Sequence, residues 1–219
     1  MSKTIVVGGG PAGMFAAIAA AEAGAGVLLL EKNEKLGKKL FITGKGRCNI
    51  TNAAEIEEFF SAVVSNPKFL YSSFYSFTND QVIDFFEKLG VQTKVERGGR
   101  VFPASDHSSD VIRALEREMG RLGVKIRLRT EVKELIVEDG TVKGALLSSG
   151  KKLYADAVII TTGGVSYPST GSTGDGYRFA RECGHKVTEL LPSLVPMEVK
   201  EWYAKELMGL SLRNIEILI

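Results

Sequence analysis

The sequence has few cysteines, no long apolar run and almost no net charge. Its two cysteines, Cys48 and Cys183, lie 135 positions apart, without a CxxC pair or a histidine at zinc-binding spacing. We therefore expect no metal site and a reduced, cytoplasmic protein. No apolar stretch approaches the ~18 residues that a membrane helix needs. Lysine and arginine (28) exceed aspartate and glutamate (26) only slightly, so charge predicts neither nucleic acid nor a membrane as partner.

Glycine is the one outlier in the composition, with 24 of 219 residues against the usual ~7%. The glycines fall in clusters and do not recur at every third position, which excludes collagen. An apolar fraction of 44% and a charged fraction of 25% are ordinary for a globular protein and exclude disorder over the whole chain. The length suits one large domain or two small ones.

The first glycine cluster lies between a predicted strand and a predicted helix. Residues 4–7 form a short β-branched run, and residues 8–13 read G-x-G-x-x-G. The alanine-rich residues 11–23 predict a helix that packs closely on a sheet. Residues 27–30 predict the next strand, which ends at Glu31. This order is typical of a dinucleotide-binding turn, and the alternative is a glycine-rich turn that binds nothing.

Each position of this turn has a physical role. Gly8 permits the tight turn, Gly10 lets the backbone approach a pyrophosphate, and Gly13 allows close helix packing. The helix N-terminus offers unpaired N–H groups. Glu31, 18 residues after Gly13, is expected to accept a hydrogen bond from a ribose hydroxyl, which favours FAD or NAD over NADP. The cofactor-binding residues predicted here are Gly8, Gly10, Pro11, Ala12, Gly13, Met14, Glu31 and Lys32.

A basic, glycine-rich stretch follows. From Lys32 to Arg47 there are six basic residues and one acid, a local charge of +5. Such a run is often a solvated loop, but its glycines would let backbone N–H groups face an anion. Cys48 would suit a redox thiol if Lys45 and Arg47 lowered its pKa. Because no second cysteine lies nearby in the sequence, a packed or cofactor-contacting role is favoured over a catalytic one.

The segment GKKLFITGKGRCNITN, residues 37–52, together with the first turn, resembles the HI0933-like or BaiN-like family of bacterial NAD(P)/FAD-dependent oxidoreductases. The resemblance covers nearly all of residues 1–198. It implies that residues 37–52 run beside FAD and that the backbone at Val132 contacts the adenine. The cofactor-binding residues that it adds are Lys39, Gly46, Arg47, Cys48, Asn49 and Val132.

Residues 156–164 form another β-branched strand, which ends in paired glycines. They resemble the flavoprotein segment that returns beside the first strand, which implies cofactor contacts from Thr162, Gly163 and Gly164. The polar loop at 166–177 is suited to meet a substrate or the edge of a flavin. Asp175 in this loop has an equally weighted alternative, which is to cap the helix that follows.

The middle of the chain predicts helices and a small antiparallel sheet. Helical signals cover about 54–89 and 110–122, and a strand is expected near 124–128. Residues 135–154 predict a three-stranded meander with a hairpin turn at Asp139-Gly140. The aromatic residues at 69–77 are expected to pack in the interior and not to stack on nucleic acid bases, because few basic residues lie among them.

These patterns predict an α/β Rossmann-type FAD-binding domain over residues 1–190, with three layers, a parallel sheet and an antiparallel β-meander. Residues 191–219 are expected to begin a second, β-rich domain. The apolar residues 214–219 predict a strand, so a missing C-terminal segment or self-association is expected.

The resemblance implies hydride transfer through FAD between a reduced nicotinamide, NAD(P)H, and an unknown small-molecule substrate. No catalytic acid or base is assigned. Two alternatives remain at this point: an NAD-dependent dehydrogenase that uses the same glycine turn, and a truncated FAD-binding fragment without catalytic activity.

Overall fold

The computed structural model describes residues 2–192, 198 and 200–210. The chain divides into two compact units, Met1–Lys186 and Val187–Ile219. The described part of the second unit contains one short helix, α8 (Tyr203–Glu206). The strand expected at 214–219 lies outside the described residues. The division at residue 190 into a cofactor domain and a second, β-rich domain stays a prediction.

A four-stranded parallel sheet with the order β10-β1-β2-β6 forms the centre of the first unit. Its strands are β10 (Ala157–Ile160), β1 (Lys3–Val7), β2 (Gly26–Leu30) and β6 (Lys125–Arg127). Thr4 lies opposite Val27 on one side and Ala157 on the other. The strand at 156–164 therefore returns beside β1, as the sequence predicts, and brings two distant segments to the same edge of the sheet.

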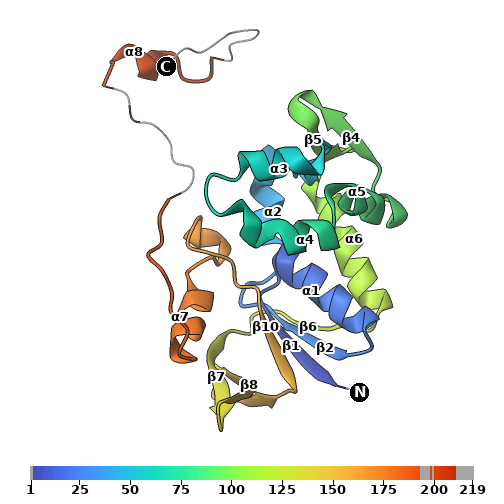
Figure 1. Ribbon diagram of the computed structural model, residues 1–219, viewed down its shortest axis with the longest axis vertical. Coiled ribbons are helices and arrows are strands. Elements are labelled where there is room, and N and C mark those ends of the chain that lie inside the picture. The colour runs from blue at the N-terminus through green and yellow to red at the C-terminus, as the bar shows by residue number, and fades with distance from the viewer. Residues whose placement is uncertain (1, 193–197, 199, 211–219) are drawn as a thin grey trace. The chain divides into compact units, whose positions relative to one another are not determined.

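Helices cover one face of this sheet and antiparallel strands cover the other (Figure 1). Helix α1 (Pro11–Glu22) packs on β1, β2 and helix α6 (Ser108–Arg121). The meander of β7 (Val132–Glu138), β8 (Thr141–Leu147) and β9 (Lys152–Tyr154) contacts β10 through β8. The predicted three-layer Rossmann-type fold with its antiparallel meander is confirmed.

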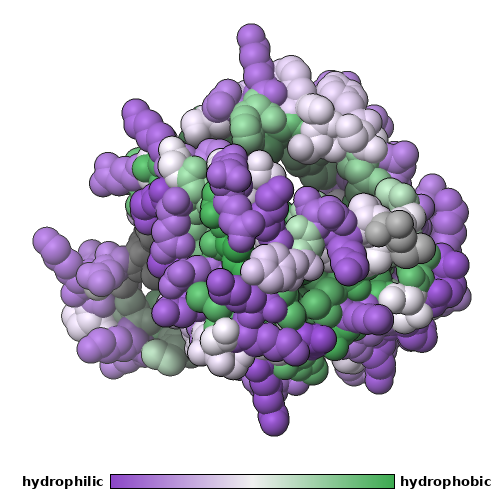
Figure 2. All heavy atoms as spheres, turned by 90° about the horizontal axis from the view of Figure 1, so that it is seen from below, coloured by the Kyte–Doolittle hydropathy of each residue, from purple (hydrophilic) through white to green (hydrophobic). Residues whose placement is uncertain are grey.

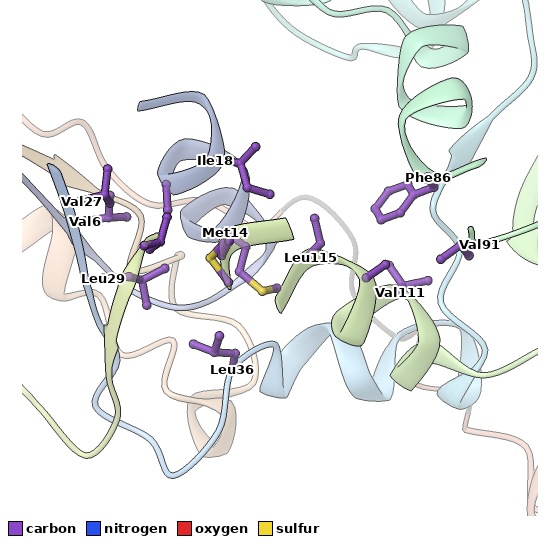
Figure 3. Close-up of a cluster of buried hydrophobic side chains, with 14 of the residues drawn as sticks. Val6, Met14, Ile18, Val27, Leu29, Leu36, Phe86, Val91, Val111 and Leu115 are labelled. Carbon is purple, nitrogen blue, oxygen red and sulfur yellow. The ribbon is translucent and has the colours of Figure 1, made fainter. Parts of the chain in front are cut away.

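A continuous apolar core joins the helices to the sheet. Met14 of α1 is fully buried and lies among Val6 and Leu29 of the strands (Figure 3). Leu115 of α6 and Phe86 of α5 (Asn79–Lys88) extend the same cluster. Burying a side chain of this size contributes about 1.5–3 kcal/mol to stability, so the cluster fixes α1 against the strands.

A second, smaller sheet with the order β3-β5-β4 lies apart from the first. Its strands are β3 (Thr51–Asn52), β5 (Arg100–Pro103) and β4 (Thr93–Glu96). Strand β3 has only two residues, too few for a detectable period, so the sequence gives no signal for its pairing with β5. The other elements are α2 (Lys38–Ile42), α3 (Ile56–Ala62), α4 (Tyr71–Ser76), α7 (Asp175–Glu182) and the 3₁₀ helices η1 (Thr43–Gly46), η2 (Pro67–Leu70), η3 (Arg97–Gly99) and η4 (Pro168–Thr170).

Hydrophilic side chains form most of the outline of the face shown in Figure 2, and apolar side chains are visible between them. Across the described residues, no helix has the length and apolar character to cross a membrane. The same part of the chain holds no group of three or more His, Cys, Asp or Glu side chains placed to bind a metal ion.

We predict that Gly13→Ala destabilises the fold. A Cβ at Gly13 would lie 1.8 Å from the carbonyl oxygen of Gly8 and 2.8 Å from Thr161 Oγ1, so α1 would have to move away from the sheet. We expect the free energy of unfolding to fall by about 2 kcal/mol or more in urea denaturation.

The matched control is Gly120→Ala in α6. A Cβ at Gly120 meets no atom within 4 Å, and alanine favours a helix interior by about 0.5–1 kcal/mol. Equal stability of the two variants would contradict the steric role of Gly13.

Candidate functional site

A cavity of about 310 Å³ lies at the carboxyl ends of β1, β2 and β10. Its walls come from the turn between β1 and α1, from the segment after β2, from the end of β10 and from the loop before α7. Strand β1 connects to β2 on one side and pairs with the late strand β10 on the other, so the cavity lies where the strand order reverses. Ligands of open α/β sheets bind at this position.

Most of the predicted cofactor-binding residues line this cavity: Gly8, Gly10, Pro11, Ala12, Glu31, Lys32, Lys39, Val132, Thr162 and Gly163. Gly13 and Met14 lie beneath it, where they are buried in α1. Gly164, Gly46, Arg47, Cys48 and Asn49 are not on its walls. The structure therefore brings the glycine turn at residues 8–13 and the end of the strand at 156–164 to one cavity, and Gly46, Arg47, Cys48 and Asn49 lie off its walls.

The turn at the N-terminus of α1 leaves space for a ligand. A Cβ at Gly8 would lie 2.5 Å from the carbonyl oxygen of Thr161, so this glycine serves the contact with β10. A Cβ at Gly10, in contrast, would meet no protein atom within 4 Å. Gly10 is the N-cap residue, and no side chain caps this end of the helix. Backbone N–H groups at such an end suit an anion, and the open space at Gly10 admits a pyrophosphate.

Glu31 is 7% exposed and is held by three donors. Its Oε2 accepts a hydrogen bond from the N–H of Gly9 (2.6 Å), and its Oε1 accepts two from the backbone and side chain of Asn33 (2.7 Å each). An ionised carboxylate has about four acceptor positions, so one on Oε2 remains for a hydroxyl group. The rigid carboxylate fits a ribose at this end of the cavity.

Lys32 contacts the first residue of α7, and Lys39 contacts the loop before that helix. Lys32 Nζ lies 2.7 Å from Asp175 Oδ2, and Lys39 Nζ donates to the carbonyl oxygen of Ser166 at 2.7 Å. Burial disfavours the charged form of Asp175, but hydrogen bonds and charge from Lys32, helped by Thr173, lower its pKa overall. The N-cap residue of α7 is Gly174 and no side chain caps that helix, so the alternative of Asp175 as a cap is wrong.

Arg47, at the end of the basic stretch of residues 32–47, binds to residues in and next to the second sheet. Its Nε donates to Asp106 at 2.8 Å, its guanidinium also pairs with Glu96, and it lies 4.2 Å from the ring centroid of Phe102. Hydrogen bonds to Glu96 and Asp106 raise the pKa of Arg47. Its charge is therefore neutralised by protein groups outside the first cavity.

Cys48 is 1% exposed, and the hypothesis of a lowered pKa is wrong. Burial raises the pKa of its thiol, and a hydrogen bond with Thr43 only partly opposes this. Cys48 and Asn49 line a second, apolar cavity of about 250 Å³, which shares Pro11 with the first cavity. A buried thiol of this kind is a poor nucleophile, which agrees with the favoured packed or contacting role.

Several wall residues of the first cavity were not assigned from the sequence. They include Asn33, Glu131, Thr161, Gly171 and Ser172. Thr161 donates to the carbonyl oxygens of Val7 (2.9 Å) and Gly8 (3.0 Å) and so joins β10 to the glycine turn. The signal for Gly171 and Ser172 was the Gly/Ser/Thr-rich loop at 166–177, whereas Asn33 and Thr161 had no pattern of their own.

Thr162 has a buried hydroxyl that lacks a hydrogen-bond partner among the described residues. Buried hydroxyls are nearly always paired with protein, water or a ligand. The Thr162 oxygen faces Gly176 of α7, where an added Cβ would lie 2.8 Å from it, so it does not open into the cavity. The space at Gly10 and the remaining acceptor on Glu31 fit a bound dinucleotide.

A parallel sheet with a glycine turn at a helix N-terminus, followed by a rigid acid after the second strand, defines a Rossmann-type dinucleotide-binding domain. The chain belongs to the HI0933-like family, because the family model described as "HI0933-like protein Rossmann domain" matches residues 2–216.

Two curated relatives support this assignment. The chain is 38% identical over 204 residues to a 3-dehydro-bile acid delta(4,6)-reductase of Clostridium scindens, covering 92% of this chain and 48% of the relative. It is 33% identical over 208 residues to a ribosomal RNA dihydrouridine synthase of Escherichia coli, covering 94% of this chain and 50% of the relative. The chain thus spans about half the length of these relatives.

A solved structure shares the fold. A 3-ketosteroid-delta4-(5alpha)-dehydrogenase from Rhodococcus jostii RHA1 superposes with a TM-score of 0.60 at 18% identity, over 76% of this chain and 47% of that one.

We predict that Arg47→Gln makes stability less dependent on acid pH. Arg47 lowers the pKa of Glu96 from its ordinary 4.5, and Lys94 with Arg47 lowers that of Asp106 from 3.8. These carboxylates stabilise the fold above their ordinary pKa values and lose this contribution as the pH falls through the depressed values. Without Arg47 the free energy of unfolding should therefore fall less steeply below pH 4.5.

Denaturant unfolding at a series of pH values measures this slope. Lys133→Gln is the control, because the one ion pair that Lys133 makes among the described residues is with its exposed neighbour Glu134 at 3.4 Å. An unchanged slope in Arg47→Gln, or an equal change in the control, would speak against the predicted coupling.

Proposed function

We propose that this chain is the FAD-binding part of a flavoprotein oxidoreductase. The observation that carries the proposal is the open space over Gly10 at the N-terminus of α1, next to the rigid carboxylate of Glu31. A pyrophosphate and a ribose are joined in every dinucleotide, and these two features lie on one cavity.

The residues that would hold FAD come from four segments. Gly10, Pro11 and Ala12 would receive the pyrophosphate, and Glu31 would accept from the ribose. Val132 would face the adenine with its backbone, and Thr162 and Gly163 would contact the cofactor from the end of β10. FAD, when bound, supplies the centre for hydride transfer, and the protein binds and orients it.

The predicted cofactor-binding residues after Gly44 do not line the first cavity. Gly46, Arg47, Cys48 and Asn49 would reach FAD only beyond the first cavity. Cys48 and Asn49 line the second cavity on the other side of Pro11. A contact between this second cavity and the flavin part of FAD is consistent with their role as implied by the family.

The names of the relatives indicate the kind of substrate. A delta(4,6)-reductase and a dihydrouridine synthase both saturate a carbon–carbon double bond in a ring. We propose the same chemistry for the whole protein, with NAD(P)H as the electron donor. A small-molecule substrate is favoured by the near-neutral charge of the chain, and the ribosomal RNA relative makes an RNA substrate the second candidate.

The first test is FAD binding by Gly10→Ala. A methyl group at this position disturbs no protein atom but occupies the space for the pyrophosphate, so we expect the Kd for FAD to rise at least about tenfold, or 1.4 kcal/mol. Quenching of flavin fluorescence measures the Kd. The fold should change by less than about 1 kcal/mol, because only an N-cap glycine is replaced.

Gly120→Ala again serves as the control and should bind FAD as the wild type does. A wild-type protein that binds NAD in this cavity and excludes FAD would favour the dehydrogenase alternative. FAD binding without turnover on any double bond would favour the non-catalytic fragment.

The second test is Glu31→Gln. The amide keeps the shape but loses the charge and turns one acceptor into a donor, which faces either the N–H of Gly9 or that of Asn33. We expect FAD affinity to fall by about 1.5–3 kcal/mol, the usual value of a hydrogen bond to a charged group. Isothermal titration with FAD and with ADP should show the same loss. Unchanged affinity for both ligands would refute the role of Glu31.

A further inference from the structure

Two segments distant in the sequence are tied together across the wall of the first cavity. Lys32 Nζ donates to Thr173 Oγ1 and to Asp175 Oδ2, both at 2.7 Å. Asn33 Nδ2 donates to the carbonyl oxygen of Thr170 at 3.2 Å. We call these three contacts, between Lys32-Asn33 and residues 170–175, the bridge.

The bridge separates two cavities. The first cavity and a more open groove of about 630 Å³ share the residues Lys32, Asn33, Thr130, Glu131 and Gly171 on their walls. The groove lies on the side of Arg129, Ser148 and Ser169. Opening the bridge would therefore make one continuous passage from the groove into the first cavity.

The backbone at Gly171 permits this close approach. A Cβ there would lie 2.5 Å from Asn33 Nδ2 and 3.3 Å from Lys32 Cε. Its φ of +97° is also one that other residues rarely adopt. The two segments thus meet at a point where any side chain would push them apart.

The ion pair of the bridge is suited to break and reform. The side chains of Lys32 and Asp175 are 25% and 23% exposed, so water reaches both charges. Ion pairs that water reaches are weaker than fully buried ones, so thermal motion can open this pair. Lys32, although it lies on the cavity wall, already has a protein anion as its partner.

We propose that Lys32 and Asp175 form a latch that opens to admit the adenosine half of FAD and closes over it. This proposal rests on the proposed FAD binding. In it, Lys32 and Asp175 are positioning residues that hold the loop at 170–175 against the cavity, and Lys32 is not a direct ligand of the phosphates.

Rapid-mixing kinetics of FAD with Lys32→Gln and Asp175→Asn test the latch. A latch hinders both the entry and the exit of FAD. Each variant removes the ion pair that keeps the latch closed, so it should raise the association and the dissociation rate constants by about fivefold. The double variant should behave like either single one. Lys32→Arg, which keeps the pair, should restore rates close to those of the wild type.

Arg113→Gln is the matched control, because it breaks an exposed ion pair with Asp110 in α6, and neither residue lines the first cavity or the groove. Its rates should not change. Gly171→Ala provides a second variant and should accelerate both steps in the same way.

The outcomes separate the two proposals. Wild-type protein that binds no FAD overturns the proposed function and the latch with it. FAD binding with unchanged rates in both single variants overturns the latch alone. A faster dissociation without faster association also overturns it, because Lys32 would then be an ordinary ligand contact.

Discussion

The contact between α1 and the turn that precedes it is the constraint on which the rest of the structure depends. Gly13 lies against the carbonyl of Gly8, and the hydroxyl of Thr161, the residue after β10, donates to the same carbonyl. Only glycine allows the helix to come this close, and this approach directs the N-terminus of α1 into the cavity. The core around Met14 and the wall of the candidate site meet at this contact.

Glu31 has a structural role as well as the proposed binding role. Its carboxylate accepts hydrogen bonds from Gly9 and Asn33, so it joins the glycine turn to the segment after β2. The same bonds hold the acid at one orientation and bring Asn33 to Thr170. A single buried carboxylate thereby joins the glycine turn to the bridge, through donors that belong to the protein itself.

Sequence patterns placed most elements within a few residues and missed those that depend on distant partners. The meander was predicted from Asp139-Gly140 and alternating residues, because a hairpin is a local structure. The pairing of Thr51 with Val101 joins segments 50 positions apart and has no local signal. Cys48 was considered a thiol of lowered pKa because lysine and arginine flank it, but burial dominates and raises its pKa. Arg47 is next to Cys48 in the sequence, but its charge is paired with Glu96 and Asp106.

The sequence by itself determined the Rossmann-type class, the glycine turn and the acid after the second strand, because backbone sterics and hydrophobic periodicity act over short spans. Only the tertiary structure decided which predicted residues share one cavity. Val132 and Thr162 line the same cavity as the glycine turn at residues 8–13, and Arg47 does not line it. It also paired Lys32 with Asp175 across 143 positions. Such contacts form only when folding brings distant segments together, since ion pairs and cavity walls are set by distance in space and not by spacing in the chain.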